Sequence, residues 1–165
     1  MESLQRERRP DRSCRSPCRQ AVLALLRSAD HVQRGLAAVV EPEGITLQQY
    51  HVLRILREAG DQALPTLEIG RRMIEQTPGI TRLLDRLEAK RLASRIRCPR
   101  DRRQVLCSIT VAGQALLSRL EQPMRQANLA ALAPLRDDEQ RTLTALLERV
   151  RTRTVDSPTT RPSIC

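Results

Sequence analysis

Aromatic side chains are almost absent from this chain: Tyr50 is the only one, and there is no Trp or Phe. Modules that bind single-stranded RNA stack bases on several aromatic rings, so a single tyrosine argues against that class of protein. The core must be built from Leu, Ile, Val and Ala instead. With 165 residues, 40% of them hydrophobic, the chain is long enough for one domain and short for two.

Long apolar runs are also missing, because no stretch approaches the roughly 20 apolar residues that a membrane-spanning helix needs. The first residues, MESLQRERRPDRSCRSPCRQ, contain no apolar signal-peptide region. We therefore expect a cytoplasmic protein without a membrane partner. The sequence has no glycine-rich phosphate loop, no GxSxG motif and no HExxH motif, so we expect no catalytic residues and no enzyme.

The chain lacks paired cysteines. None of its five cysteines forms a CxxC pair and the number is odd, so neither a disulfide framework nor a zinc site is predicted. We expect reduced thiols, no metal and no cofactor. Cys98 and Cys107 fall in predicted strands and are expected to be structural, with Cys107 packing as a small apolar group.

Basic charge is present in excess: 29 Lys and Arg against 19 Asp and Glu give a net charge of +10, which favours an anionic partner. Residues 71–103 hold ten arginines and one lysine against four acidic residues, so this fifth of the chain holds +7 of that charge. We expect residues 1–18 to be a flexible basic arm, which could serve solubility alone, and residues 154–165 to be a disordered tail. Residues 19–153 are the single predicted domain.

Apolar spacing predicts three helices before residue 75. Residues 19–40 carry a broad apolar face at helical spacing. A second helix of about 13 residues is expected after Thr46 as N-cap, with Tyr50 facing inward and Gly60 as the stop signal. Thr66 is a candidate cap for a short third helix over residues 67–74.

The stretch EQTPGITRLLDRLEAKR predicts a fourth helix, with Thr77 as the cap and Pro78 at the first helical position. Together with the short helix before it, this makes a helix-turn-helix. Ile80, Leu83, Leu84 and Leu87 form one apolar stripe, and the opposite face suits a DNA major groove. Alternatively, that face is only a solvated surface with internal ion pairs. Its polar residues are Gln76, Thr77, Gly79, Thr81, Arg82, Asp85 and Arg86.

Alternating residues in LASRIRC and RQVLCSIT predict two short strands that flank the turn PRDRR as a hairpin, or wing. So many arginines on one turn repel each other, and a narrow DNA minor groove would supply the negative potential they need. We expect the Asp101 carboxylate to hold one guanidinium while another side chain reaches into the groove. The alternative is a merely soluble loop.

The motifs PGITRLLDRLEAKRL, DRRQVLCSIT and AGQALL resemble the MarR family of winged helix-turn-helix transcription regulators, over about residues 20–153. The resemblance implies a homodimer on a pseudo-palindromic double-stranded DNA operator. Arg91 stands where the family usually has glycine, which makes a left-handed cap there less expected. The predicted DNA-binding residues are Gln76, Thr77, Pro78, Gly79, Thr81, Arg82, Arg86, Arg95, Arg97, Arg100, Asp101, Arg102 and Arg103.

The fold class is therefore mainly α with a small β-hairpin wing. Thr110 is expected to cap a long helix, and acidic residues 137–139 start a last one. We assign residues 45–110 to the winged helix-turn-helix lobe and residues 19–40 and 110–153 to dimerisation, because these helices carry more apolar face than the lobe can cover. A helical monomer and a helical interaction protein that binds no DNA are the alternatives.

The resemblance also implies a repressor released from DNA by a small aromatic carboxylate or phenolic effector. The candidate effector-binding residues combine imidazole, phenol and guanidinium groups. A thiol-based redox switch at Cys18, with Cys14, is the alternative mode of regulation, because a helix N-terminus favours the thiolate. The effector-binding candidates are His31, Arg34, Tyr50, His51 and Arg54.

Overall fold

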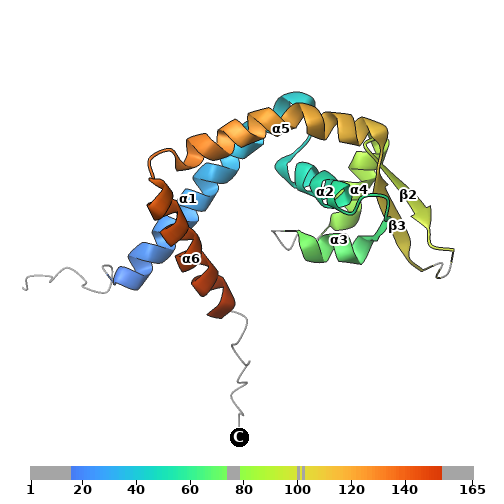
Figure 1. Ribbon diagram of the computed structural model, residues 1–165. Helices are drawn as coiled ribbons and strands as arrows, with labels where there is room; N and C mark the ends of the chain where they lie inside the picture. The colour runs from blue at the N-terminus through green and yellow to red at the C-terminus, as the bar shows by residue number, and fades with distance from the viewer. Residues whose placement is uncertain (1–15, 74–78, 100, 102, 154–165) are drawn as a thin grey trace, which may run out of the picture.

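The computed structural model describes residues 16–73, 79–99, 101 and 103–153, and the fold is mainly α with one small sheet. The predicted arm and tail lie outside these residues, except that Ser16 is the N-cap of the first helix and Pro17 and Cys18 belong to it. The elements, drawn in Figure 1, are α1 (Pro17–Val40), the 3-10 helix η2 (Glu41–Glu43), α2 (Leu47–Glu58), β1 (Leu64–Pro65), α3 (Thr66–Arg72), α4 (Ile80–Ala89), β2 (Ala93–Arg97), β3 (Val105–Ile109), α5 (Val111–Leu132) and α6 (Asp137–Arg153).

The elements separate into two parts joined by α5. In Figure 1, helices α2, α3 and α4 gather with the sheet in one lobe, while α1, α6 and the end of α5 extend away from it. The first half of α5 belongs to the lobe, since Leu116, Leu117 and Leu120 are buried in its core. Helix α1 packs along α5, so the two long helices connect the lobe to the extended part.

Helix α2 starts and stops where the sequence predicts. The Thr46 hydroxyl accepts a hydrogen bond from the Gln49 amide at 3.2 Å, and the Gln49 side chain accepts one from the Thr46 amide at 3.0 Å. This capping box satisfies two amides at the helix start. The helix ends before Gly60, which has a left-handed φ of 61°. Tyr50 and Leu53 face inward as predicted.

The sheet has one strand more than the predicted hairpin. Strands β2 and β3 pair antiparallel, from Ala93 opposite Ile109 to Arg97 opposite Val105, which confirms the wing. The short strand β1 pairs with the other edge of β3, with Leu64 opposite Cys107. Strand β3 is therefore the central strand of the sheet, with β1 on one side and β2 on the other, and its pairing with β1 joins the wing to the lobe.

Helix α3 does not use its predicted cap. The helix begins at Thr66 itself, with Pro65 in the N-cap position and no side-chain capping bond. The Thr66 hydroxyl instead donates to the Val105 carbonyl of β3 at 3.3 Å. Because the adjacent strand offers an acceptor, the hydroxyl joins the helix to the sheet rather than capping its own helix, and the prediction for Thr66 is wrong.

Helix α4 buries the predicted stripe of Leu83, Leu84 and Leu87. It begins at Ile80, with Gly79 as N-cap at a φ of 118°, two residues later than the predicted start. The predicted cap Thr77, with Gln76 and Pro78, lies outside the described residues.

The turn after α4 is left-handed at Arg91, with a φ of 58°, so the expectation drawn from its replacement of glycine is wrong. The Arg91 amide donates to the Glu88 carbonyl at 2.8 Å and the Leu92 amide to the Leu87 carbonyl at 2.9 Å. This is the hydrogen-bond pattern of a Schellman cap. The Thr110 hydroxyl also donates to the Arg91 carbonyl at 2.7 Å, and these bonds together hold the unfavourable conformation.

The two C-terminal helices begin as predicted. The Thr110 hydroxyl accepts from the Gly113 amide at 3.1 Å and so caps α5. Helix α6 begins at Asp137 with three acidic residues in its first turn, where the positive end of the helix dipole favours them. Within the part of the chain that the structure describes, no helix combines the length and apolar character needed to cross a membrane.

Candidate nucleic-acid interface

A groove of about 670 Å³ lies between α3, the start of α4 and the wing, and is called here the α3–wing groove. The short β1 strand places α3 beside β3, and the antiparallel hairpin carries the wing tip to the far side of the groove. The groove is lined by Pro65, Thr66, Leu67, Glu68, Arg71, Ile80, Thr81, Arg95, Arg103, Gln104 and Val105.

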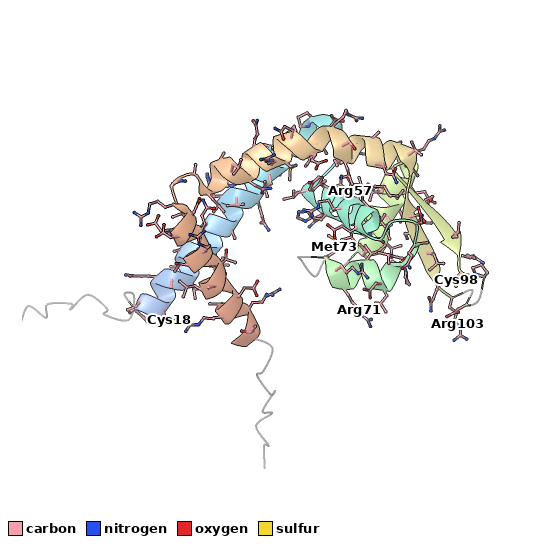
Figure 2. The ribbon with its side chains drawn as sticks, in the orientation of Figure 1. Cys18, Arg57, Arg71, Met73, Cys98 and Arg103 are labelled. Carbon is pink, nitrogen blue, oxygen red and sulfur yellow. The ribbon has the colours of Figure 1, made fainter. Side chains whose placement is uncertain are left out.

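Arginines stand on both sides of the α3–wing groove. The Arg71 side chain on α3 is 71% exposed, and Arg103 on the wing is exposed as well. Figure 2 shows the two side chains at the same edge of the lobe. Arg71 was not among the predicted DNA-binding residues, although the adjacent arginines at the end of a short helix were a signal for it. Two separated guanidinium groups on one edge suit an extended anion such as a nucleic-acid backbone.

The polar face of α4 is exposed, as a helix that enters a groove of DNA requires. Thr81 lines the α3–wing groove, so the start of α4 lies between Arg71 and the wing. Arg82 and Arg86 are exposed one turn apart along the same helix, and Gly79 is exposed at its start. The predicted contacts of α4 that the structure describes therefore share a solvent-facing surface opposite the buried leucines.

Arg95 differs from the other predicted DNA-binding arginines that the structure describes, because its side chain is only 24% exposed and points at α4. Its guanidinium forms ion pairs with Asp85, at 2.6 Å, and with Glu88. The hydrogen bond to Glu88 is the main cause that raises the pKa of Arg95. Arg97, two residues further along β2, is exposed and belongs to the basic surface of the wing.

The wing tip is closed by the carboxylate and the carbonyl of Asp101. The Asp101 carboxylate accepts from the Arg103 backbone amide at 3.0 Å and from the Gln104 side chain at 3.1 Å. The Gln104 amide donates to the Asp101 carbonyl at 2.9 Å, which closes a turn. Neither bond involves a guanidinium, the Arg103 side chain is exposed, and the predicted pairing of Asp101 with one guanidinium stays a prediction. Arg100 and Arg102 lie outside the described residues.

Four of the five effector-binding candidates line three different hollows. Arg34 and His51 line a hollow of about 280 Å³ between α1 and α2, and His51 and Arg54 line another of about 170 Å³. His31 lines a third hollow, of about 290 Å³, between α1 and α5. Tyr50 is buried in the core with its ring centroid 5.9 Å from that of His51. His51 is thus the candidate that two hollows share.

The cysteines occupy different environments. Cys18 is exposed near the start of α1, at the end of the molecule away from the lobe (Figure 2), and Cys14 lies outside the described residues. Cys107 is fully buried in β3, as predicted, and burial is the main cause that raises the pKa of its thiol. Among the described residues, no group of three or more His, Cys, Asp or Glu side chains could hold a metal ion.

The helices α3 and α4, the three-stranded sheet and the arginines around the α3–wing groove together define a winged helix-turn-helix transcription regulator. A MarR family model matches residues 45–105, which run from the start of the lobe to the wing. A MarR transcription factor from Planctomyces limnophilus is 36% identical, and its match covers 81% of this chain and 97% of that one with a TM-score of 0.66. The chain belongs to the MarR family.

Two Escherichia coli proteins add to this comparison. A variant of MarR, solved in complex with operator DNA, is 28% identical with a TM-score of 0.71, covering 77% of this chain and 90% of that one. The homoprotocatechuate degradative operon repressor is 28% identical over 126 residues, which are 76% of this chain and 84% of the repressor.

Proposed function

We propose that this MarR-family regulator is a repressor that binds a pseudo-palindromic DNA operator as a homodimer and releases it when a small aromatic acid or phenol binds. One observation carries the proposal: α4 exposes its polar face between the arginines of α3 and of the wing. This arrangement offers a helix to the major groove and a basic hairpin to the adjacent minor groove. The operator complex of the related E. coli MarR supports a double-stranded partner.

Uncovered apolar side chains support the homodimer. A monomer rarely exposes contiguous apolar surface of this kind, and a second copy of the same helices would bury it. We therefore assign residues 19–40 and 110–153 to the dimer interface and residues 45–110 to DNA binding. The exposed large apolar residues of these helices are Val22, Leu23, Leu25, Leu26, Val111, Leu129, Leu132, Leu146, Leu147 and Val150.

The effector assignment is supported by chemistry and by a relative's name. The related E. coli protein is named a repressor of the homoprotocatechuate degradative operon, and homoprotocatechuate is an aromatic acid. In this chain, Arg34 and His51 share the hollow between α1 and α2, where a guanidinium and an imidazole can orient a carboxylate or phenolate. Arg34 is paired with Asp30 at 2.8 Å, so an anionic effector would exchange one carboxylate partner for another.

A gel-shift titration over salt tests the proposal, using a duplex selected by the protein from a random pool. Binding through phosphate contacts predicts a steep loss of affinity as salt rises. Arg103→Ala should weaken binding by roughly 1 to 3 kcal/mol. Arg125→Ala, on exposed α5 surface outside the α3–wing groove, removes the same charge and should leave affinity nearly unchanged.

Three results would count against it. Unchanged affinity of a folded Arg103→Ala variant would remove the wing from the mechanism. Affinity that does not depend on salt would favour a helical interaction protein. A panel of aromatic acids and phenols that leaves the complex intact would remove the proposed effector class.

A further inference from the structure

We propose that Arg95, Asp85 and Glu88 form a bracket that holds the wing at a fixed orientation to α4, which makes Arg95 a positioning residue rather than a DNA contact. The inference rests on the proposed function, because it concerns how two DNA-binding elements are aligned. It reassigns one residue of the predicted DNA-binding set.

The bracket uses the whole guanidinium of Arg95. Nη1 lies 2.6 Å from the Asp85 Oδ1 atom, and Nε donates to the Glu88 Oε2 atom at 2.8 Å. Nη2 also donates to Glu88. Asp85 and Glu88 are three residues apart on α4, so the planar guanidinium of β2 reaches two neighbouring positions on one face of the helix. Bonds of this forked kind fix direction as well as distance.

The same contacts make Arg95 a poor phosphate ligand. A phosphate would have to displace two carboxylates from a side chain that is only 24% exposed. The three groups together carry one net negative charge, in a region that is otherwise strongly basic. By contrast, Arg71 is 71% exposed on the opposite side of the same groove. The basic surface can therefore bind DNA through Arg71 and Arg103 while Arg95 stays with α4.

The position of the bracket explains what it controls. Strand β2 leaves α4 through the left-handed turn at Arg91, which is one fixed point between helix and hairpin. The Arg95 bracket is a second fixed point four residues further along the chain. The turn at Arg91 and the pairing of β1 with β3 hold the base of the hairpin, and the bracket adds a directed contact between β2 and α4. The bracket thereby sets where Arg103 lies when α4 enters the major groove.

Neutralising the acidic residues separates the two roles of Arg95 by the sign of the effect. If Arg95 were a DNA contact, Glu88→Gln would free it and remove a negative charge near DNA, so binding would tighten. If Arg95 is a positioning residue, Glu88→Gln and Asp85→Asn weaken specific binding although the protein becomes more positive. Arg95→Lys should also weaken it, because an ammonium cannot reproduce the fork.

The experiment measures affinities for the duplex selected by the wild-type protein and for a random duplex of equal length. We expect the specific-to-random affinity ratio to fall about tenfold for Glu88→Gln and for Asp85→Asn. Glu58→Gln is the matched control, because it neutralises a carboxylate of the same lobe that pairs with Arg54 of its own helix and does not line the α3–wing groove. It should keep the ratio. An unchanged or raised ratio for Glu88→Gln would overturn the bracket.

Hydrogen exchange of the free protein supplies a readout that needs no DNA. Glu88→Gln should speed exchange of the β2 and β3 amides near the wing tip, and Glu58→Gln should not. Equal exchange in wild type and Glu88→Gln would overturn the bracket even if DNA binding changed. If the wild-type protein selects no duplex, the proposed function fails, and hydrogen exchange alone decides whether the bracket holds the wing.

Discussion

Arg91 is the one non-glycine residue with a positive φ among those that the structure describes. A left-handed conformation costs an L-residue roughly 1 to 2 kcal/mol. Glycine avoids this cost, but it loses more conformational entropy on folding, which offsets part of the gain. Arg91→Gly should therefore raise the free energy of unfolding by about 0.5 to 1 kcal/mol. Urea denaturation measures the change.

A neighbouring residue supplies the control for that prediction. Lys90 has an ordinary φ of −84°, so Lys90→Gly should lower the free energy of unfolding. A decrease for both variants would show that Arg91 is not strained.

Cys18 is exposed and Cys107 is buried, so the two thiols should react at different rates with an alkylating reagent. Burial raises the pKa of the Cys107 thiol, so less of it is thiolate than in an exposed cysteine at the same pH. Cys18 is exposed and should be alkylated by iodoacetamide in the native protein well before Cys107. Mass spectrometry of tryptic peptides distinguishes the two sites, and equal rates at pH 8 would contradict the structure.

The raised pKa also has a consequence for stability. The folded chain keeps the Cys107 proton to higher pH than the unfolded chain does. The contribution of this thiol to the free energy of unfolding is therefore complete below the ordinary thiol pKa of about 8.5 and is lost as pH rises above it. The free energy of unfolding of Cys107→Ala should therefore fall less between neutral and alkaline pH than that of the wild-type protein.

Among the elements, α5 meets the turn after α4 at a point where only glycine fits. A Cβ on Gly113 would lie 2.2 Å from the Leu92 carbonyl oxygen and 2.8 Å from the Ile109 side chain. The Leu92 carbonyl cannot move freely, because it accepts the Thr110 amide at 3.1 Å. Gly113→Ala should lower the free energy of unfolding by about 2 kcal/mol or more, as overpacking against backbone does.

Gly35 in α1 provides the comparison for Gly113. Apart from its chain neighbours and the backbone of its own helix, no described heavy atom lies within 4 Å of a Cβ built there, so Gly35→Ala should raise stability by about 0.5 to 1 kcal/mol. Equal destabilisation by both substitutions would contradict this account, in which contact decides the effect at Gly113 and helix propensity decides it at Gly35.

Local patterns predicted most of the elements, and contacts distant in the sequence account for the rest. The capping residues Thr46 and Thr110 could be identified because their partners are three residues away. Strand β1 could not, since it is two residues long and exists only by pairing with β3. The same applies to Thr66, whose hydroxyl bonds a strand 39 residues further along.

The candidate site shows the same limit. Residue type and spacing indicated a basic wing, but not which arginine was occupied by carboxylates. Asp85 and Glu88 could equally have paired along their own helix, and only the packing of β2 against α4 brings Arg95 to both of them. Arg71 was missed because α3 faces the wing only once β1 has joined the sheet.

At the scale of the whole molecule, charge and apolar surface occupy different parts. Residues 71–103 hold +7 of the net charge of +10, and those that the structure describes lie in the winged lobe. Most of the exposed large apolar residues lie on α1, α5 and α6, and Leu67 and Ile96 are the two in the described part of the lobe. Pairing through the apolar helices would leave both basic surfaces free. A duplex that spans two such surfaces meets one α4 helix from each subunit.

The mass of the protein–duplex complex is the most direct test of this arrangement. Sedimentation at saturating protein, with the selected duplex at low salt, should give two chains of 18.7 kDa per duplex. The same ratio should persist as protein is diluted toward the dissociation constant, because the dimer forms before it binds. A complex that saturates with a single chain per duplex would contradict the proposed paired regulator.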